Sequence, residues 1–309
     1  MSAALLAPLP RRERAANGST KAVVTGASLL VVAGLAGVAV FLGVQGWPAL
    51  RADSSQLPMQ ATSLWDLALP LAFGSLWASF LALLMAVPVA VGAALFITWY
   101  APRSVSRFLG AVIDVLAAVP SVVYGLWGLM VLAPVMAKLY AWLGAHLGWF
   151  PLFAGQPSAT GRTILTAAVV LAIMVMPIMA AICREVFQRT PQASTEAALA
   201  LGATKWETIR MAVFPFARSG MISGAMLGLG RALGETMATA MVISPAPFLI
   251  SVSLITSSNP NTVAAFIAQN FPEAHGVQVS ALVALGLVLF AITFAVNALA
   301  RKIANGGTK

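Results

Sequence analysis

Six long apolar runs constrain the fold of this 309-residue chain more than any other feature of its sequence. Each run is long enough to cross roughly 30 Å of hydrocarbon as a helix. The sequence therefore predicts an all-α polytopic membrane protein. The six membrane spans are expected near residues 22–45, 67–98, 108–136, 162–187, 214–243 and 277–300.

Composition excludes the main soluble alternatives. Hydrophobic residues make up 60% of the chain and charged residues 9%, whereas a soluble domain carries about a quarter charged residues. The net charge of +9 does not indicate nucleic-acid binding, because the basic residues are scattered between apolar runs. With one cysteine and two isolated histidines, neither an intrachain disulfide nor a metal site is expected. We interpret the prolines inside the runs as helix kinks; they are Pro88, Pro120, Pro134 and Pro177.

The distribution of Lys and Arg predicts the orientation of the chain. If the N-terminus is cytoplasmic, 14 of the 18 basic residues lie in inside segments. Only Arg51, Lys138 and Arg162 then lie outside, and Arg231 lies within a span. The positive-inside rule therefore places both termini in the cytoplasm.

This orientation defines the parts of the chain. Residues 1–66 form a cytoplasmic tail, the first span and an outer loop, and residues 67–301 form the transmembrane domain with a cytoplasmic loop at 189–215. Residues 302–309 are a cytoplasmic tail. The outer segment 137–161 carries Trp142, Trp149 and Phe150, which suit a membrane interface. The outer stretch SNPNT, residues 258–262, indicates a turn.

The cytoplasmic loop 189–215 predicts two short helices. Thr190 is expected to cap the first, with Pro191 at its first helical position, and Gly202 to end it in a left-handed conformation. Thr204 and Glu207 then match a capping box that starts the second helix. The loop is therefore expected to be an ordered elbow, either a simple connection or a docking element.

The same loop resembles the EAA loop of bacterial ABC importer permeases. Its motif residues here are Glu196, Ala197, Ala198 and Gly202, followed by a later proline. The resemblance implies the type I importer permease fold and a coupling helix that docks into a separate ATPase. The chain has no G-x-x-x-x-G-K-[ST] phosphate loop. We therefore expect no enzyme activity and no cofactor in this chain, with ATP and Mg bound by the partner ATPase.

Two charges interrupt the fifth apolar run. Arg231 and Glu235 lie in the stretch GLGRALGETMA, residues 228–238, where each charge costs roughly 2.5–3.5 kcal/mol on insertion scales. On a continuous helix they share one face with small residues at which another helix or a path can approach closely; these are Gly220, Gly224, Gly228 and Ala238. We predict that Arg231 contacts an anion in transit and that Glu235 pairs with it and weakens its hold. A purely structural ion pair is the alternative.

Two motifs extend the resemblance. R-A-L-G-E is typical of oxyanion permeases, and its continuation G-E-T-M-A resembles the phosphate type. The run AAVPSVVYGLWGL, residues 117–129, is similar to the third span of permeases of the PstC type. The resemblance implies a permease subunit of a high-affinity, ATP-driven phosphate importer in the bacterial plasma membrane. Its partners would be a PstA-type permease, two PstB-type ATPase subunits and an extracytoplasmic PstS-type phosphate-binding protein.

Several alternatives stay open at this stage. The same machine could carry sulfate or molybdate, or the chain could be a secondary ion-coupled carrier or a structural membrane subunit. Asp114, near the cytoplasmic end of the third span, is expected to pair with a loop arginine such as Arg103 or Arg107, and a role in tuning substrate release is the alternative. Ser121 and Tyr124 are expected to pack rather than to line a path.

Overall fold

The computed structural model describes residues 11–306, and within that range the chain is helical with no strand. The α-helices are α1 (Arg11–Gly46), α2 (Leu64–Leu95), α3 (Arg103–Ala117), α4 (Ser121–Trp127), α5 (Ala133–Leu147), α6 (Ile164–Gln188), α7 (Gln192–Ala200), α8 (Lys205–Thr208), α9 (Phe214–Leu233), α10 (Met237–Val242), α11 (Val263–Asn270) and α12 (Val277–Gly306). Short 3-10 or π segments are η2 (Trp47–Arg51), η3 (Ser54–Gln56), η4 (Pro58–Gln60), η5 (Phe96–Tyr100), η6 (Gly128–Leu132), η7 (Pro151–Phe153), η8 (Ile209–Val213) and η9 (Phe271–Glu273).

The prediction of six membrane-spanning helices is confirmed. Six helical stretches of the described chain have the length and composition needed to cross a bilayer. They run over Thr20–Arg51, Leu64–Tyr100, Ser121–Leu147, Ile164–Gln188, Lys205–Leu233 and Val277–Lys302. Helix α12 continues to Gly306, so part of the expected tail 302–309 is helical, and residues 307–309 lie outside the described range.

Two of the expected spans are wrong as continuous helices. The third, placed at 108–136, is divided, because α3 ends at Ala117 and α4 begins only after Pro120. Pro120 is extended, with φ −58° and ψ 138°, so it starts a new helix instead of kinking an existing one. The fifth, placed at 214–243, is divided in the same way between Leu233 and Met237.

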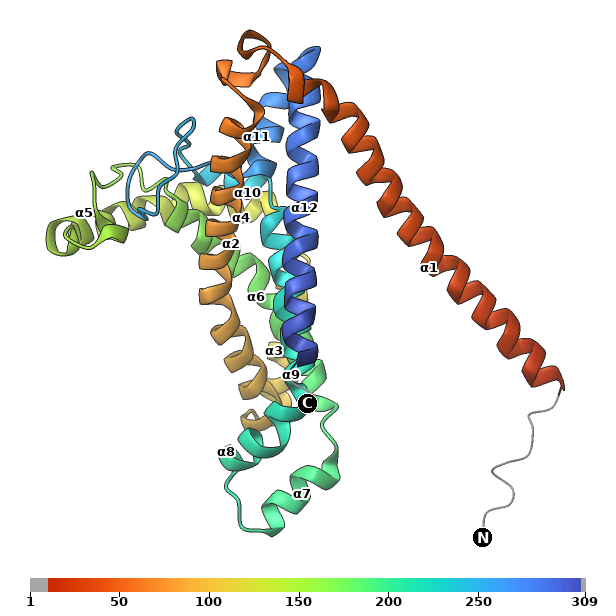
Figure 1. The fold of residues 1–309 in the computed structure, drawn as a ribbon. Helices are drawn as coiled ribbons and strands as arrows, with labels where there is room; N and C mark the ends of the chain where they lie inside the picture. Colours follow the sequence, from red (N-terminus) through yellow and green to blue (C-terminus); the bar gives the residue numbers. More distant parts are fainter. Residues whose placement is uncertain (1–10, 307–309) are drawn as a thin grey trace.

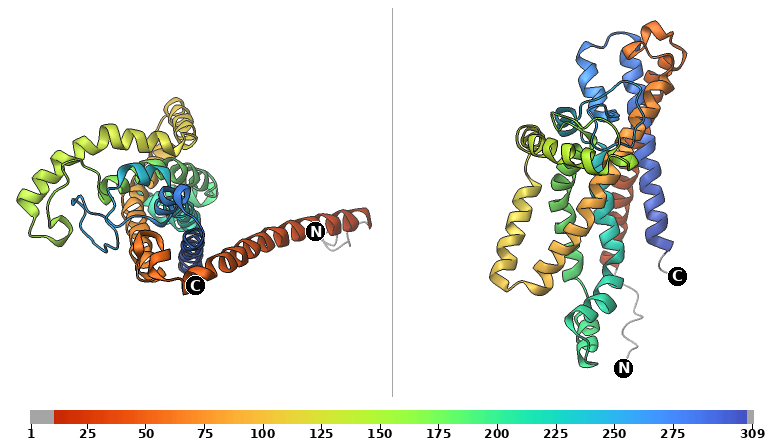
Figure 2. Two further views of the ribbon diagram at one scale, coloured as in Figure 1. Left: turned by 90° about the horizontal axis from the view of Figure 1, so that it is seen from above. Right: turned by 90° about the vertical axis from the view of Figure 1, so that its left-hand side faces the viewer.

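Helices α2, α6, α9 and α12 run side by side as an upright bundle, and α1 diverges from it (Figure 1). None of the apolar window of α1 is buried, and the helix contacts α12 near Gly46, which lies against Ala284. Helix α5 projects sideways from the bundle, as the view from above in Figure 2 shows. The start of α1 and the end of α12 both lie toward the α7–α8 end (Figure 1).

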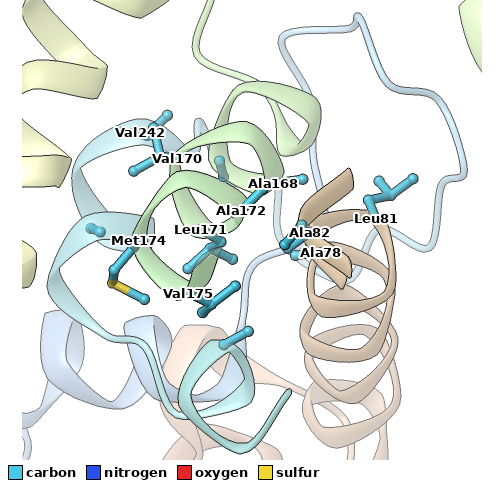
Figure 3. Packing of buried hydrophobic residues seen from close by; sticks show 14 of the residues in the cluster. Ala78, Leu81, Ala82, Ala168, Val170, Leu171, Ala172, Met174, Val175 and Val242 are labelled. Atoms are coloured by element: carbon cyan, nitrogen blue, oxygen red, sulfur yellow. The ribbon is translucent and has the colours of Figure 1, made fainter. Parts of the chain in front are cut away.

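The centre of the bundle is a contact between α2 and α6 made through small residues. Every fourth residue of α2 is a fully buried alanine, and the set is Ala78, Ala82, Ala86, Ala90 and Ala94. Residues four apart lie on one helix face, so this alanine row lets the two backbones approach closely. Figure 3 shows Ala78 and Ala82 on the side of α2 that faces Leu171 and Ala172 of α6.

Ala82→Leu should destabilise the protein by about 1–3 kcal/mol, because the added carbons have no room between α2 and α6. The matched control is Val89→Leu, which adds a carbon to a side chain of α2 that is 51% exposed. Thermal unfolding of the detergent-solubilised protein measures both. Equal melting temperatures for the two variants would contradict the tight α2–α6 contact.

Candidate translocation path and coupling elbow

Three of the four glycines of α9, all but Gly230, lie against α6. A Cβ atom added to any one of them would meet an α6 side chain. At Gly224 it would lie 3.2 Å from Ile182 Cγ2, and at Gly228 it would lie 2.7 Å from Met179 Sδ. The third, Gly220, faces Val186. The glycine face of α9 therefore packs on a helix and is not itself open.

The predicted pairing of Arg231 with Glu235 is wrong in this structure. Helix α9 ends at Leu233, and Gly234 follows it as the C-cap, so the two charged residues do not share a helix face. Among the side chains that the structure describes, those of residues 20–302, the ion pairs are Arg184–Asp114 and Arg189–Glu185, and neither involves this site. The predicted single helix face, running from Gly220 through Glu235 to Ala238, is also wrong, because α9 ends at Leu233.

Glu235 instead caps the short helix α10. Its side chain is buried, at 8% exposure, and Oε1 accepts a hydrogen bond of 3.1 Å from the Ala238 N–H. Thr239 Oγ1 donates to the Glu235 carbonyl oxygen at 2.9 Å. A carboxylate at a helix start satisfies N–H groups that the helix leaves free. This contact explains why a glutamate is tolerated here without a cationic partner.

Arg231 remains without a protein acceptor. It is half-buried, and among the described residues its guanidinium makes no hydrogen bond or ion pair. It lies within electrostatic reach of Tyr124, whose hydroxyl donates to the Leu116 carbonyl oxygen at 2.9 Å. A half-buried guanidinium with free donors is suited to an anionic ligand that accepts several hydrogen bonds.

The two interrupted helices meet near this arginine. Helix α4 packs on α10 through small residues: a Cβ on Gly125 would lie 2.8 Å from Ala238 Cα, and one on Gly128 would lie 3.1 Å from Val242 Cγ2. The break before α4 and the break before α10 are thereby brought into one region of the bundle. Tyr124, on α4, was expected only to pack, yet its hydroxyl bridges the first break, and it lies within electrostatic reach of Arg231.

Asn259 was missed by sequence reasoning, which took SNPNT for a simple turn. The side chain is fully buried. Its Oδ1 accepts from the Ile164 N–H at 3.0 Å, and its Nδ2 donates to the carbonyl oxygens of Ser244 and Thr256 at 3.2 and 3.1 Å. Arg162 completes the arrangement, since its Nη2 donates to the Ile243 carbonyl oxygen at the end of α10. Together these contacts fix the far end of α10 against α6.

The elbow between α6 and α9 has the two helices that its sequence predicts. The capping box of Thr204 and Glu207 is confirmed, with both reciprocal hydrogen bonds present. Gly202 has φ +84°, as expected for a left-handed residue after α7. The Thr190 cap is wrong: Pro191 precedes the first residue of α7, and the Thr190 hydroxyl makes no hydrogen bond.

The motif residues of the elbow divide into two environments. Ala198 is buried against the chain, whereas Glu196 and Ala197 are exposed on α7. Leu201, between α7 and Gly202, is 89% exposed, which is unusual for a leucine with no local partner. Gly202 has no atom within 4 Å of the place where a Cβ would lie.

Comparison with known proteins agrees with this architecture. Residues 86–305 match the family described as the binding-protein-dependent transport system inner membrane component. The chain belongs to this family. Helix α1 and the first part of α2 precede the matched region.

Curated relatives cover most of the chain. It is 43% identical over 317 residues to the phosphate transport system permease protein PstC 2 of Mycobacterium tuberculosis, an alignment that covers 98% of this chain and 96% of the relative. It is 48% identical over 234 residues to PstC of Xylella fastidiosa strain 9a5c, covering 74% and 71%.

Solved structures of ABC importers share the fold. A bacterial ABC transporter that imports alginate gives a TM-score of 0.54 at 16% identity, covering 78% of this chain and 80% of the other. The inward-facing MetNI methionine transporter gives 0.52 at 16% identity, covering 77% and 96%. These similarities show that the chain is a multi-pass ABC importer permease in fold.

Asn259→Ala should lower the free energy of unfolding by about 1–3 kcal/mol, because it removes the partners of the buried Ile164 N–H and of the Thr256 carbonyl oxygen. Asn270→Ala is the control, since that side chain is only half-buried and makes a single hydrogen bond, to the Phe266 carbonyl oxygen. Thermal unfolding in detergent compares the two. A larger loss for Asn270→Ala would contradict the role assigned to Asn259.

Proposed function

We propose that this chain is the permease subunit of an ATP-driven importer of inorganic phosphate in the bacterial plasma membrane. The observation that carries the proposal is the 43% identity, over 98% of the chain, to a protein named as a phosphate transport permease. The unpaired, half-buried Arg231 supports it, because a planar fork of donors suits a tetrahedral oxyanion.

The assembly would contain this chain, a homologous PstA-type permease, two PstB-type ATPase subunits and an extracytoplasmic PstS-type phosphate-binding protein. The ATPase subunits would hold ATP and Mg. Both termini would be cytoplasmic, which agrees with the distribution of basic residues and with the start of α1 and the end of α12, which both lie toward the α7–α8 end of the molecule (Figure 1).

Coupling between the ATPase and the path would use a continuous helix. Residues Lys205–Leu233 form one helical stretch of 29 residues that begins at the elbow and carries Arg231 near its far end. At 1.5 Å per residue, about 39 Å separate Lys205 from Arg231. Closure of the ATPase dimer would move α7 and α8, and this helix would transmit the displacement to the site.

Glu235 would act on the path through α10 and not by pairing with Arg231. Its carboxylate holds the start of α10, and α10 packs on α4 beside Tyr124. The negative charge would also moderate the positive potential around Arg231, so that an anion is bound weakly enough to leave.

Arg231→Ala should abolish uptake of labelled phosphate at low external concentration, because the anion loses its charged partner. The measurement uses cells that lack this gene, complemented at matched membrane levels with wild type, Arg231→Ala or the control Arg218→Ala. Arg218 lies on the same helix but is exposed. Excess sulfate or molybdate serves as competitor. Full competition by either ion would mean that this oxyanion, and not phosphate, is the substrate. Normal transport by Arg231→Ala would contradict the role proposed for the arginine.

Leu201→Asp should uncouple the complex, because an exposed leucine at the elbow is placed to enter an apolar groove of the ATPase. We expect a loss of ATPase subunits from the purified complex and a parallel loss of uptake. The matched control is Gln192→Asp, at the exposed start of α7. Retention of the ATPase by Leu201→Asp would contradict this docking role.

A further inference from the structure

A pocket of about 320 Å³ lies between the start of α2 and the segment that follows α10. Four of its lining residues are large apolar side chains that are 45% to 59% exposed: Trp65, Leu69, Phe248 and Ile250. Among the described residues of the lining, Asp66 is the one that carries a charge. The pocket therefore combines two aromatic rings and two aliphatic side chains with a single carboxylate.

The pocket lies beyond the level at which α6 begins. A Cβ on Gly74 of α2 would meet the carbonyl oxygen of Asn261, two residues after the Asn259 side chain that holds the start of α6. At 1.5 Å per residue, Asp66 lies about 12 Å beyond Gly74 along α2. Helix α6 has 25 residues and already spans the roughly 30 Å of hydrocarbon. The pocket therefore faces water and not the lipid core.

This end of α2 is the outer end in the proposed orientation. Figure 1 shows the start of α2 at the end of the molecule opposite α7 and α8. With α7 and α8 in the cytoplasm, a molecule that enters the pocket comes from the extracytoplasmic side.

The carboxylate of Asp66 is held in place by one of its two oxygens. Oδ2 accepts hydrogen bonds from the hydroxyls of Thr62 and Ser63. Within the described chain, Oδ1 accepts no hydrogen bond and Asp66 forms no ion pair. The cap of α2 comes from Ser63 Oγ, which accepts from the Asp66 N–H at 3.3 Å. The charge of Asp66 is thus not needed to start the helix, and Oδ1 is free for a ligand.

The backbone around the pocket adopts unfavourable conformations. Met59, Gln60 and Phe248 have φ of 56°, 55° and 55°, and they are the non-glycine residues of the described chain with left-handed φ. Gln60 and Phe248 line the pocket, and Met59 adjoins Gln60. Strained backbone of this kind gathers at ligand sites and switch regions. It agrees with a pocket whose shape serves a ligand.

The chemistry of the lining selects a cation with an apolar stem. A carboxylate repels phosphate, so the pocket does not belong to the anion path. Aromatic rings attract an ammonium or guanidinium group over their faces, and aliphatic side chains cover the methylene stem of Lys or Arg. Exposed apolar side chains that gather on the water side are typical of a contact with another protein.

We propose that this pocket is a docking site for a lysine or arginine side chain of the extracytoplasmic phosphate-binding protein. The basic group binds Asp66 Oδ1, and its stem lies against Trp65 and Phe248. Phe248 follows Ile243, the C-cap of α10, by five residues, so docking acts on the segment that leads directly to α10. This inference rests on the proposed function and names a point of contact with one of its partners.

Binding of labelled, phosphate-loaded binding protein to the whole transporter in nanodiscs tests this contact. Asp66→Asn should weaken binding by roughly tenfold or more, because it removes the charge from a charge-assisted hydrogen bond and keeps the shape of the side chain. The salt dependence of the affinity should fall as well. Asp53→Asn is the matched control and should bind as wild type does, since Asp53 is exposed in the same outer segment but does not line the pocket. Wild-type affinity and salt dependence in Asp66→Asn would overturn the proposal.

A charge exchange identifies the occupant. Asp66→Lys should weaken binding more than Asp66→Asn does, and replacing one Lys or Arg of the binding protein by Glu should restore part of the loss. Such a recovery cannot come from the folding of this chain, because the second change is in the other protein. If no single replacement of this kind recovers any binding, the occupant is not a basic side chain of that protein and the proposal is wrong.

The outcomes separate this inference from the proposed function. If wild type imports phosphate and binds the phosphate-binding protein, the proposed function stands whatever the Asp66 variants do. If Asp66→Asn then binds as tightly as wild type, the pocket is not the point of contact. If wild type neither imports phosphate nor binds such a protein, both proposals fail.

Discussion

The interior of a bilayer offers no water to hydrogen-bond the backbone, so every interruption of a membrane helix must be satisfied by the protein itself. This constraint organises the two breaks in the chain. The break after α3 is bridged by Tyr124, whose hydroxyl reaches back to the Leu116 carbonyl oxygen. The break after α9 is stabilised by two hydrogen bonds at the first turn of α10. The Glu235 carboxylate accepts from the Ala238 N–H, and the Thr239 hydroxyl donates to the Glu235 carbonyl oxygen.

The same contacts place Arg231 at the candidate site. Because Glu235 is engaged with the start of α10, it is not available to neutralise the arginine four residues earlier. Arg231 therefore keeps its donors free at the end of a long helix that begins at the elbow. The hydrogen bond of Glu235 to α10 thus leaves the guanidinium of Arg231 free to bind a ligand.

Close packing supplies the rigid frame for this arrangement. The alanine row of α2 lies against α6, and so do Gly220, Gly224 and Gly228 of α9, so α6 is held from two sides by small residues. At the far end of α10, Asn259 and Arg162 tie the outer segment to the start of α6. The short helix α10 is thus fixed at both ends, by Glu235 at its start and by Arg162 at its end.

Local chemistry was predictable from the sequence, and contacts distant in sequence were not. Hydrophobic length gave six spans, and the capping box of Thr204 and Glu207 depends on residues three apart. The breaks were missed because Pro120 and Gly234 also occur inside membrane helices, where local sequence does not tell a kink from an end.

The partners of Asp114 and Asn259 were missed for another reason. Arg184 lies 70 residues from Asp114, and Ile164 lies 95 residues from Asn259. No periodicity within a single helix reports such pairs. The four-residue spacing of Gly220, Gly224 and Gly228 correctly predicted a face of α9 that packs closely on another helix. That face ends with the helix, at Leu233.

The measurement that tests the account most directly is a double-mutant cycle between Arg231 and Glu235, read as thermal stability of the purified protein. The variants are Arg231→Ala, Glu235→Ala and the two together. If Glu235 caps α10 and does not pair with Arg231, the two losses should add within about 0.5 kcal/mol, as they do for side chains that do not interact. A coupling energy well above about 1 kcal/mol would show that the two charges form an ion pair. That result would contradict both the break at Gly234 and the free guanidinium on which the proposed path depends.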